Sequence, residues 1–208
     1  MIKTVICFFE RLIILKSSTK DSNKEKILGV VLKYISENET HQITIREIAR
    51  LAGVNSAAIS YYFGSKDNLI QEACKYYYDL GNRIFEEIES NDDEPRDKLK
   101  RFFINYTNHM FKFPGFLKAQ ISQYINETQI RTDVVTWLQS NCKILSDCIG
   151  QATEEKNPEI LYFKSIQLLS SIVYPFLLNK YSCAFGGLNF GDEAIRAKYI
   201  DTMLDGVL

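Results

Sequence analysis

The chain has 208 residues, of which 46% are hydrophobic and 25% are charged, with a formal net charge of −1 at pH 7. This length allows one large domain or two small ones, and the composition supports a hydrophobic core beneath a water-soluble surface. The overall charge gives no sign of a nucleic-acid partner, but its distribution does. Residues 1–66 hold 10 Lys and Arg against 6 Asp and Glu, whereas residues 67–208 hold 15 against 20. A basic first part on an acidic remainder is typical of a protein that places only its first part on phosphates.

The residue types that carry metals, redox chemistry and catalysis are few and scattered. The two histidines, His41 and His109, complete no zinc spacing. An enzyme would need a poised nucleophile or a paired acid and base, and this pattern supplies neither. The cysteines form no C-x-x-C pair, so we interpret them as free thiols of a cytoplasmic protein and expect no cofactor or metal. They are Cys7, Cys74, Cys142, Cys148 and Cys183.

Residues 1–20 form an apolar N-terminal extension ahead of the first regular helix pattern. Glu10 and Arg11 interrupt the apolar run and no small-residue cleavage site follows, which disfavours a signal peptide. An extra helix on the body or on a partner is the better interpretation, with a poorly ordered lead-in as the alternative. No apolar run approaches the roughly 20 residues of a membrane helix, so we expect no membrane association.

A first helix is predicted from the polar residues 19–23 to about Asn38, with apolar residues at helical spacing. Thr44 then opens a capping box with Glu47, which predicts a second helix that ends at Gly53. Asn55 and Ser56 are good N-caps for a third helix, predicted over Ala57–Tyr62. Gly64 is predicted to end this helix, and Ser65 to cap the next one.

A short helix, a turn containing glycine and a second short helix form the motif that reads DNA. The second helix enters the major groove by its N-terminal end, where the small residues Ala57 and Ala58 allow close approach to base edges or thymine methyl groups. Tyr61, Tyr62 and Lys66 can bind phosphates. The alternative is that the aromatic residues Tyr61, Tyr62 and Phe63 are core residues. We favour this alternative for Phe63 alone.

The stretch from about Lys24 to Tyr78 resembles the DNA-binding domain of the tetracycline-repressor-like (TetR) regulators. The residues that carry this resemblance are Thr44, Ile48, Ala49, Ala52, Gly53, Val54, Tyr61, Phe63, Ser65, Lys66 and Leu69. It implies DNA-backbone contacts by Thr44, Arg46, Tyr61, Tyr62 and Lys66, with Arg46 also a candidate for a base contact. It implies that base edges face Asn55, Ser56 and Ala57, and we add Ser60 to this set. A Gly-Thr pair common in the family is Ala57-Ala58 here, Ser60 replaces a frequent Tyr, and Tyr62 replaces a frequent His, so the operator sequence stays open.

The remainder is predicted to be helical throughout. One long helix over 66–89 links the DNA-binding domain, residues 21–66, to a ligand-binding and dimerisation domain within residues 67–208. Further helices are expected over about 95–112, 116–126, 132–151 and from Pro158, where Pro175 is a candidate kink, with a last helix from Asp192. Pro114-Gly115 is expected to break the chain between the first two of these helices. No strand-like alternation competes, so the fold class is all-α.

The last two predicted helices are apolar on more than one face, which indicates burial in a large core or in a partner. We expect a homodimer through these helices, as the resemblance also implies. Polar residues between the aromatic residues of the body suggest a mostly apolar ligand site, although each one can equally be a core residue. The candidates are Phe102, Tyr106, His109, Phe116, Gln120, Tyr124, Trp137, Asn141 and Tyr174.

Together these features predict a ligand-responsive transcriptional regulator that binds a palindromic operator on double-stranded DNA as a homodimer. Repression, and release by a small apolar or aromatic effector, are what the resemblance implies. The alternative is a DNA-binding regulator with no small-molecule effector.

Overall fold

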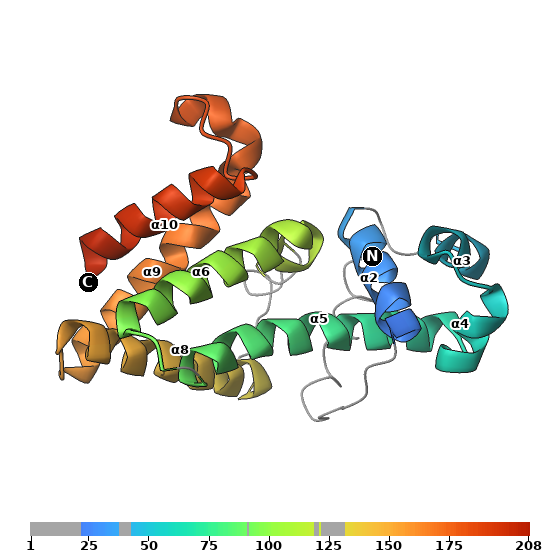
Figure 1. The fold of residues 1–208 in the computed structure, drawn as a ribbon, viewed down its shortest axis with the longest axis horizontal. Coiled ribbons are helices and arrows are strands. Elements are labelled where there is room, and N and C mark those ends of the chain that lie inside the picture. The colour runs from blue at the N-terminus through green and yellow to red at the C-terminus, as the bar shows by residue number, and fades with distance from the viewer. Residues whose placement is uncertain (1–21, 38–42, 91, 119–120, 122–131) are drawn as a thin grey trace. The chain divides into compact units, whose positions relative to one another are not determined.

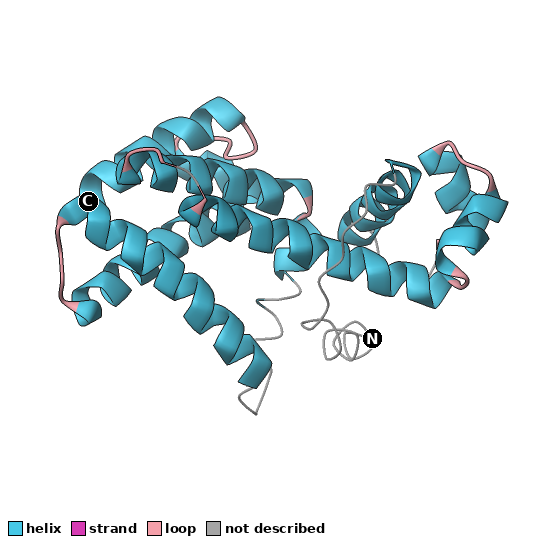
Figure 2. Ribbon diagram, turned by 60° about the horizontal axis from the view of Figure 1, so that its bottom comes forward, coloured by secondary structure: helices cyan, strands magenta, loops and turns pink. Residues whose placement is uncertain are grey.

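A computed structural model describes residues 22–37, 43–90, 92–118, 121 and 132–208. Helices and their connections make up this described part, without a strand, which confirms the all-α prediction (Figures 1 and 2). The predicted extension, residues 1–20, lies outside the described residues. The elements in chain order are α2 (Ser22–Glu37), α3 (Ile45–Ala52), α4 (Ser56–Phe63), α5 (Lys66–Glu89), α6 (Pro95–Lys112), α8 (Thr132–Thr153), α9 (Pro158–Leu178), the 3-10 helix η1 (Asn179–Phe185) and α10 (Glu193–Val207).

The chain divides into two compact units. The head unit contains the described residues up to Leu80 together with those from Phe113 to Ile121, and the body unit contains Gly81–Lys112 and the described residues from Thr132 onward. Residues 67–80 and the segment after Phe113 were predicted to lie in the body domain, whereas in the structure they belong to the head unit. The long helix α5 therefore contributes its first part to the head unit and its second part to the body unit.

The head unit has its own hydrophobic core, to which each of its helices contributes. Ile27 and Val31 of α2, Ile48 of α3 and Ile59 of α4 are all fully buried or nearly so. An isolated helix of eight residues is barely stable in water. Burial of an apolar side chain of this size contributes about 1.5–3 kcal/mol, so a few such residues compensate for that instability. The short helices α3 and α4 therefore depend on this core to hold their shape.

A segment distant in sequence completes that core. Residues 114–118 are helical, two residues earlier than the predicted start at Phe116. Of the rest of that predicted helix only Ile121, which is also helical, lies within the described residues. Phe116 stacks on Tyr77 of α5 with ring centroids 4.4 Å apart, and Phe113 meets the same ring edge-on at 5.9 Å. The Gly115 backbone N–H donates to the Ser36 hydroxyl oxygen at 3.0 Å, which ties this segment to the end of α2.

The body unit is a helical bundle in which α6 packs against α8, α9 and α10. Its core is formed by apolar residues spaced three or four apart on each helix, among them Leu99, Phe103, Leu145, Ile149, Leu168, Ile172, Ile200 and Leu204.

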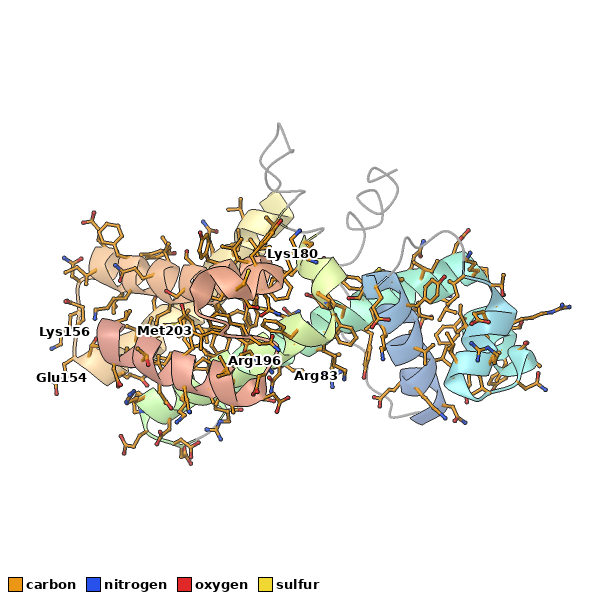
Figure 3. All side chains as sticks on the ribbon, turned by 90° about the horizontal axis from the view of Figure 1, so that it is seen from above. Arg83, Glu154, Lys156, Lys180, Arg196 and Met203 are labelled. Carbon is orange, nitrogen blue, oxygen red and sulfur yellow. The ribbon has the colours of Figure 1, made fainter. Side chains whose placement is uncertain are left out.

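Arg196 of α10 is also buried, and Figure 3 labels it together with Met203 of the same helix. Its guanidinium donates to the carbonyl oxygens of Phe190 and Gly191, each at 2.8 Å, and to Asn108 Oδ1 of α6 at 2.6 Å. These bonds satisfy most of the buried donors and hold the start of α10 against α6.

Pro175 lies inside α9 and has no backbone N–H, so the carbonyl oxygen of Ser171 loses its usual helical donor. The Tyr199 hydroxyl of α10 donates to that oxygen at 2.7 Å. The neighbouring helix thus supplies the hydrogen bond that the proline removes, and α9 and α10 are linked at this point.

We expect Tyr199→Phe to destabilise the body unit by about 1–3 kcal/mol, because it leaves the part-buried Ser171 carbonyl without a donor. Tyr162→Phe is the matched control, since Tyr162 is exposed on α9. Urea denaturation followed by circular dichroism measures both variants. Equal midpoints for the two would show that the Tyr199 hydrogen bond contributes nothing to stability.

The outer face of α9 is apolar and only partly covered by the chain. Phe163, Ile166 and Tyr174 are 54%, 54% and 62% exposed. The stretch Pro158–Cys183 is long and apolar enough to cross a membrane by length and composition only, and 22% of its most apolar window is buried. The expectation that no apolar run approaches the length of a membrane helix is therefore wrong. The expectation that α10 would also be apolar on more than one face is wrong, because its exposed positions are Glu193, Ala194, Lys198, Thr202, Asp205 and Gly206.

Candidate nucleic-acid interface

The first helix of the motif, α3, begins and ends at the residues predicted to cap it. The Thr44 hydroxyl oxygen accepts a hydrogen bond from the Glu47 backbone N–H at 3.2 Å. At the other end Gly53 adopts φ of +62°, and the N–H of Val54 reaches back to the carbonyl oxygen of Ala49 at 3.0 Å. This left-handed glycine turns the chain sharply from α3 toward α4.

The second helix, α4, spans Ser56–Phe63, one residue longer at each end than predicted. Asn55 is its N-cap, and its Oδ1 accepts from the Ala57 backbone N–H at 2.9 Å. Gly64 ends the helix at φ of +70°. Ser65 then caps α5, since its hydroxyl oxygen accepts from the Asn68 backbone N–H at 3.1 Å. Both caps were predicted from the sequence, because a cap depends on residues within a few positions of it.

The inner faces of α3 and α4 fix the angle between the two helices. Ile48, Ala49 and Ala52 are buried on α3, and Ile59 and Phe63 are buried on α4. Phe63 is therefore a core residue, as expected. The remaining surface of α4 is left for contact with a ligand or partner.

The predicted DNA-contacting residues lie mainly on that remaining surface. Tyr61 is 84% exposed, although a tyrosine ring normally seeks at least partial burial. Thr44, Arg46, Asn55, Ala57 and Ser60 are exposed as well, whereas Ser56, Tyr62 and Lys66 are half-buried.

Tyr62 differs from Tyr61 in packing partly against the core of the head unit. Its ring lies edge-on to Tyr61 with centroids 5.3 Å apart. The ring body packs inward, as a core residue would, while the half-buried side chain still reaches the surface, so the DNA contact of Tyr62 stays a prediction. Lys66 is the first residue of α5, directly after the Gly64–Ser65 turn.

The sequence did not predict the residues of α2 and α5 that contact the end of α4. Lys24 of α2 forms an ion pair with Glu72 of α5 at 2.7 Å, and its ammonium lies 5.6 Å from the Phe63 ring centroid. The Asn68 amide donates to the Phe63 carbonyl oxygen at 2.9 Å and so satisfies an end of α4. Only the Asn68 contact is local enough for a sequence pattern to suggest it.

The candidate ligand residues are distributed over both units. Phe102 and Tyr106 stack at 5.5 Å in the body unit, and each also contacts Phe85 of α5. Phe116, in contrast, packs in the head unit, and Tyr174 lies exposed on α9. Gln120, Tyr124 and the side chain of Trp137 lie outside the described residues.

Two candidates are polar groups buried in the body unit. His109 is buried on α6, and burial, with a smaller contribution from the Lys112 charge, lowers its pKa to about 4, so the imidazole is neutral at pH 7. Asn141 is buried on α8, and among the described residues its Nδ2 has no hydrogen-bond partner. An unsatisfied buried amide costs about 1–3 kcal/mol, and a ligand acceptor could recover this energy.

The fold and the interface together define a helix-turn-helix DNA-binding protein with a helical body. Residues 27–73 match the family model described as "Bacterial regulatory proteins, tetR family". The head unit therefore carries a DNA-binding domain of the TetR family, whose members are transcriptional regulators and not enzymes.

The known relatives that the chain resembles are transcriptional regulators, and the solved structures below share its fold. The chain is 25% identical over 169 residues to the "Probable HTH-type transcriptional regulator YttP" of Bacillus subtilis (strain 168), covering 78% of this chain and 81% of the relative. It is 30% identical over 78 residues to "HTH-type transcriptional regulator BetI 1" of Chromohalobacter salexigens, 37% of this chain and 39% of the relative.

The fold is similar to that of a transcriptional regulator from Aquifex aeolicus VF5, with a TM-score of 0.59 at 15% identity over 90% of this chain and 100% of the other. A TetR transcriptional regulator from Streptomyces coelicolor gives a TM-score of 0.56 at 20% identity over 88% and 97% of the two chains.

Proposed function

We propose that this protein is a cytoplasmic repressor that binds a palindromic operator as a homodimer and releases it when a small, mostly apolar or aromatic effector enters the body unit. The observation that carries the DNA-binding part is the exposed ridge of α4, where Tyr61 stands almost fully in solvent beside Ala57 and Ser60. Such a ridge along the outer face of a recognition helix fits the major groove. Thr44 and Lys66 flank it and supply phosphate contacts, and Arg46 supplies a phosphate or base contact.

Lys66→Ala is expected to weaken binding to all DNA sequences alike and to flatten the salt dependence by about one unit for each head unit bound, because one phosphate contact is lost. Fluorescence anisotropy with a labelled duplex at several salt concentrations measures the slope. Lys118→Ala, which removes an exposed lysine elsewhere on the same unit, is the control. An unchanged slope in Lys66→Ala would remove this lysine from the phosphate contacts.

The exposed apolar face of α9 supports the homodimer. A pair of recognition helices reads a palindrome, whereas one α4 reads too few bases for a specific site. The dimer would bury Phe163, Ile166 and Tyr174 against the same residues of the second copy, as a two-fold interface requires. We therefore place the interface mainly on α9, with α10 contributing polar contacts at its margin.

The stacked aromatic residues of α6 support an effector site next to α5. Phe102 and Tyr106 contact Phe85 of α5, so a ligand that separates these rings would act directly on the helix that begins at Lys66. The buried Asn141 amide offers a hydrogen-bond donor to such a ligand. A regulator without an effector is the second candidate, because these same rings already pack well against one another.

The test of the proposed function is salt-dependent binding of the full chain to the DNA upstream of its own gene. A specific complex that weakens steeply with salt is expected, and a complex that is equally tight on unrelated DNA would contradict it. Apolar compounds that raise the melting temperature are then added to the complex. Release of the DNA supports the effector, while stabilised protein that stays bound favours the candidate without one.

A further inference from the structure

The exposed surface of α4 is unusually poor in groups that read bases by hydrogen bonds. The helix reads SAAISYYF and contains no charged residue and no Asn or Gln. The side chains that most often recognise guanine and adenine in the major groove are Arg, Lys, Asn and Gln. The helix therefore lacks all four of them.

Several polar groups on and next to α4 are bonded to the chain itself, whereas Arg46 of α3 stays a candidate for a phosphate or base contact. The Oδ1 of Asn55 accepts the Ala57 backbone N–H at 2.9 Å, so the paired donor and acceptor that recognise adenine are not both available. The Ser60 hydroxyl lies 3.5 Å from the Ser56 carbonyl oxygen. On α3, Arg50 donates to both carboxylate oxygens of Glu47, at 2.6 and 3.3 Å. This ion pair occupies the guanidinium and the carboxylate that could otherwise read guanine and cytosine.

What α4 does present is a small apolar surface. Ala57 is exposed in the first turn, beside the half-buried Ala58 and one helical turn before Tyr61. In the major groove the C5 methyl group of thymine is the one apolar feature of a base edge. An alanine methyl without a neighbouring charge is suited to pack against it.

We propose that α4 reads its half-site mainly through the methyl groups of thymines that pack against Ala57, and not through hydrogen bonds to base edges. This inference rests on the proposed DNA-binding function and names the feature of the DNA that the same site recognises. Loss of one buried methyl contact corresponds to about 0.8 kcal/mol, a fourfold loss of affinity, and to about fifteenfold when it is lost in both half-sites of a palindrome.

The experiment begins with a duplex selected from a random library by the full-length protein. At each thymine of the half-site, the parent T·A pair is compared with three symmetric replacements: U·A, 5-methylcytosine·G and cytosine·G. At the position facing Ala57 we expect T·A and 5-methylcytosine·G to bind alike, and U·A and cytosine·G to bind about fifteenfold more weakly. Readout by a hydrogen bond to the thymine O4 would instead group T·A with U·A, and that result would overturn the inference.

Ala57→Gly tests the protein side of the same contact. Comparing thymine with uracil within one variant cancels any cost of the glycine to helix stability. We expect the ratio of the two affinities to fall close to one in Ala57→Gly and to stay unchanged in the control Ala194→Gly. This control makes the same backbone change at the equivalent position of α10, where the Asp192 side chain accepts the Ala194 backbone N–H as Asn55 accepts that of Ala57. Equal ratios in both variants would overturn the role of Ala57. Selected duplexes that bind with no thymine-to-uracil effect refute this inference alone, whereas failure to select any duplex refutes the proposed function with it.

Discussion

Replacing Gly115 by Ala is expected to destabilise the head unit by about 3 kcal/mol, the upper end of what overpacking costs. A Cβ at this position would lie 2.5 Å from the Ser36 carbonyl oxygen and 2.8 Å from its Cα. Carbon atoms in contact prefer separations of about 3.5–4 Å. Both obstructing atoms are backbone, so no side-chain rotation relieves the clash.

The movement that relieves the clash also breaks favourable contacts. Moving residues 113–117 away from α2 would lose the hydrogen bond from the Gly115 N–H to the Ser36 hydroxyl. It would also separate the Phe116 ring from Tyr77, on which it stacks. The core behind α3 and α4 would then be incomplete, and we expect operator binding to fall together with stability.

Gly29→Ala is the matched control for Gly115→Ala. Gly29 lies inside α2, where an added Cβ meets no atom within 4 Å. The same change should therefore stabilise the protein, by about 1 kcal/mol, because alanine favours the helix. Urea denaturation followed by circular dichroism measures both variants, and anisotropy measures the affinity for DNA. Two variants of equal stability would show that the segment after Phe113 is not required by the head unit.

The contact between Gly115 and Ser36 marks the limit of what the sequence could predict. Thr44, Gly53, Asn55 and Ser65 were placed at helix ends because capping is a local matter, and the structure has each of them there. Gly115 was expected only to break a helix. Its partner lies 79 positions away, and no local pattern encodes such a pairing.

The aromatic residues show a second limit of prediction from sequence. Phe102 and Phe116 both fit an apolar ligand site by residue type, yet Phe116 packs in the core of the head unit. A hydrophobic side chain satisfies a core and a binding site equally well, so residue type cannot distinguish the two. Tyr61 was easier to assign. Ile59 and Phe63 occupy the inner face of the short helix α4, so Tyr61 had to lie on its outer face.

Phe163→Glu is expected to convert the proposed dimer into a monomer at micromolar concentration. The change puts a carboxylate on the exposed apolar face of α9, between Ile160 and Ile166. A two-fold interface would bury this charge twice, and an unpaired buried charge costs about 3–5 kcal/mol. The dimer dissociation constant should therefore rise at least about 100-fold. Sedimentation equilibrium measures this constant directly.

Leu138→Glu is the matched control, since Leu138 is a 39% exposed apolar residue on α8 of the same body unit. Its dissociation constant should stay within about threefold of the parent, as expected for an exposed substitution worth about 0.5 kcal/mol. The two variants together separate a specific interface from general sensitivity to added charge. A dimeric Phe163→Glu protein would place the interface elsewhere, and dissociation in both would point to disruption of the body unit.

The salt dependence of DNA binding links this interface to the recognition helix. A dimer with both α4 helices in the major groove contacts twice as many phosphates as a monomer with one. The Phe163→Glu monomer should therefore show about half the salt slope of the parent, in addition to its lower affinity. Adding Lys66→Ala should then remove about one unit from the monomer and about two units from the dimer. A full slope in a protein shown to be monomeric would mean that one head unit makes all the phosphate contacts, and the palindromic operator would be ruled out.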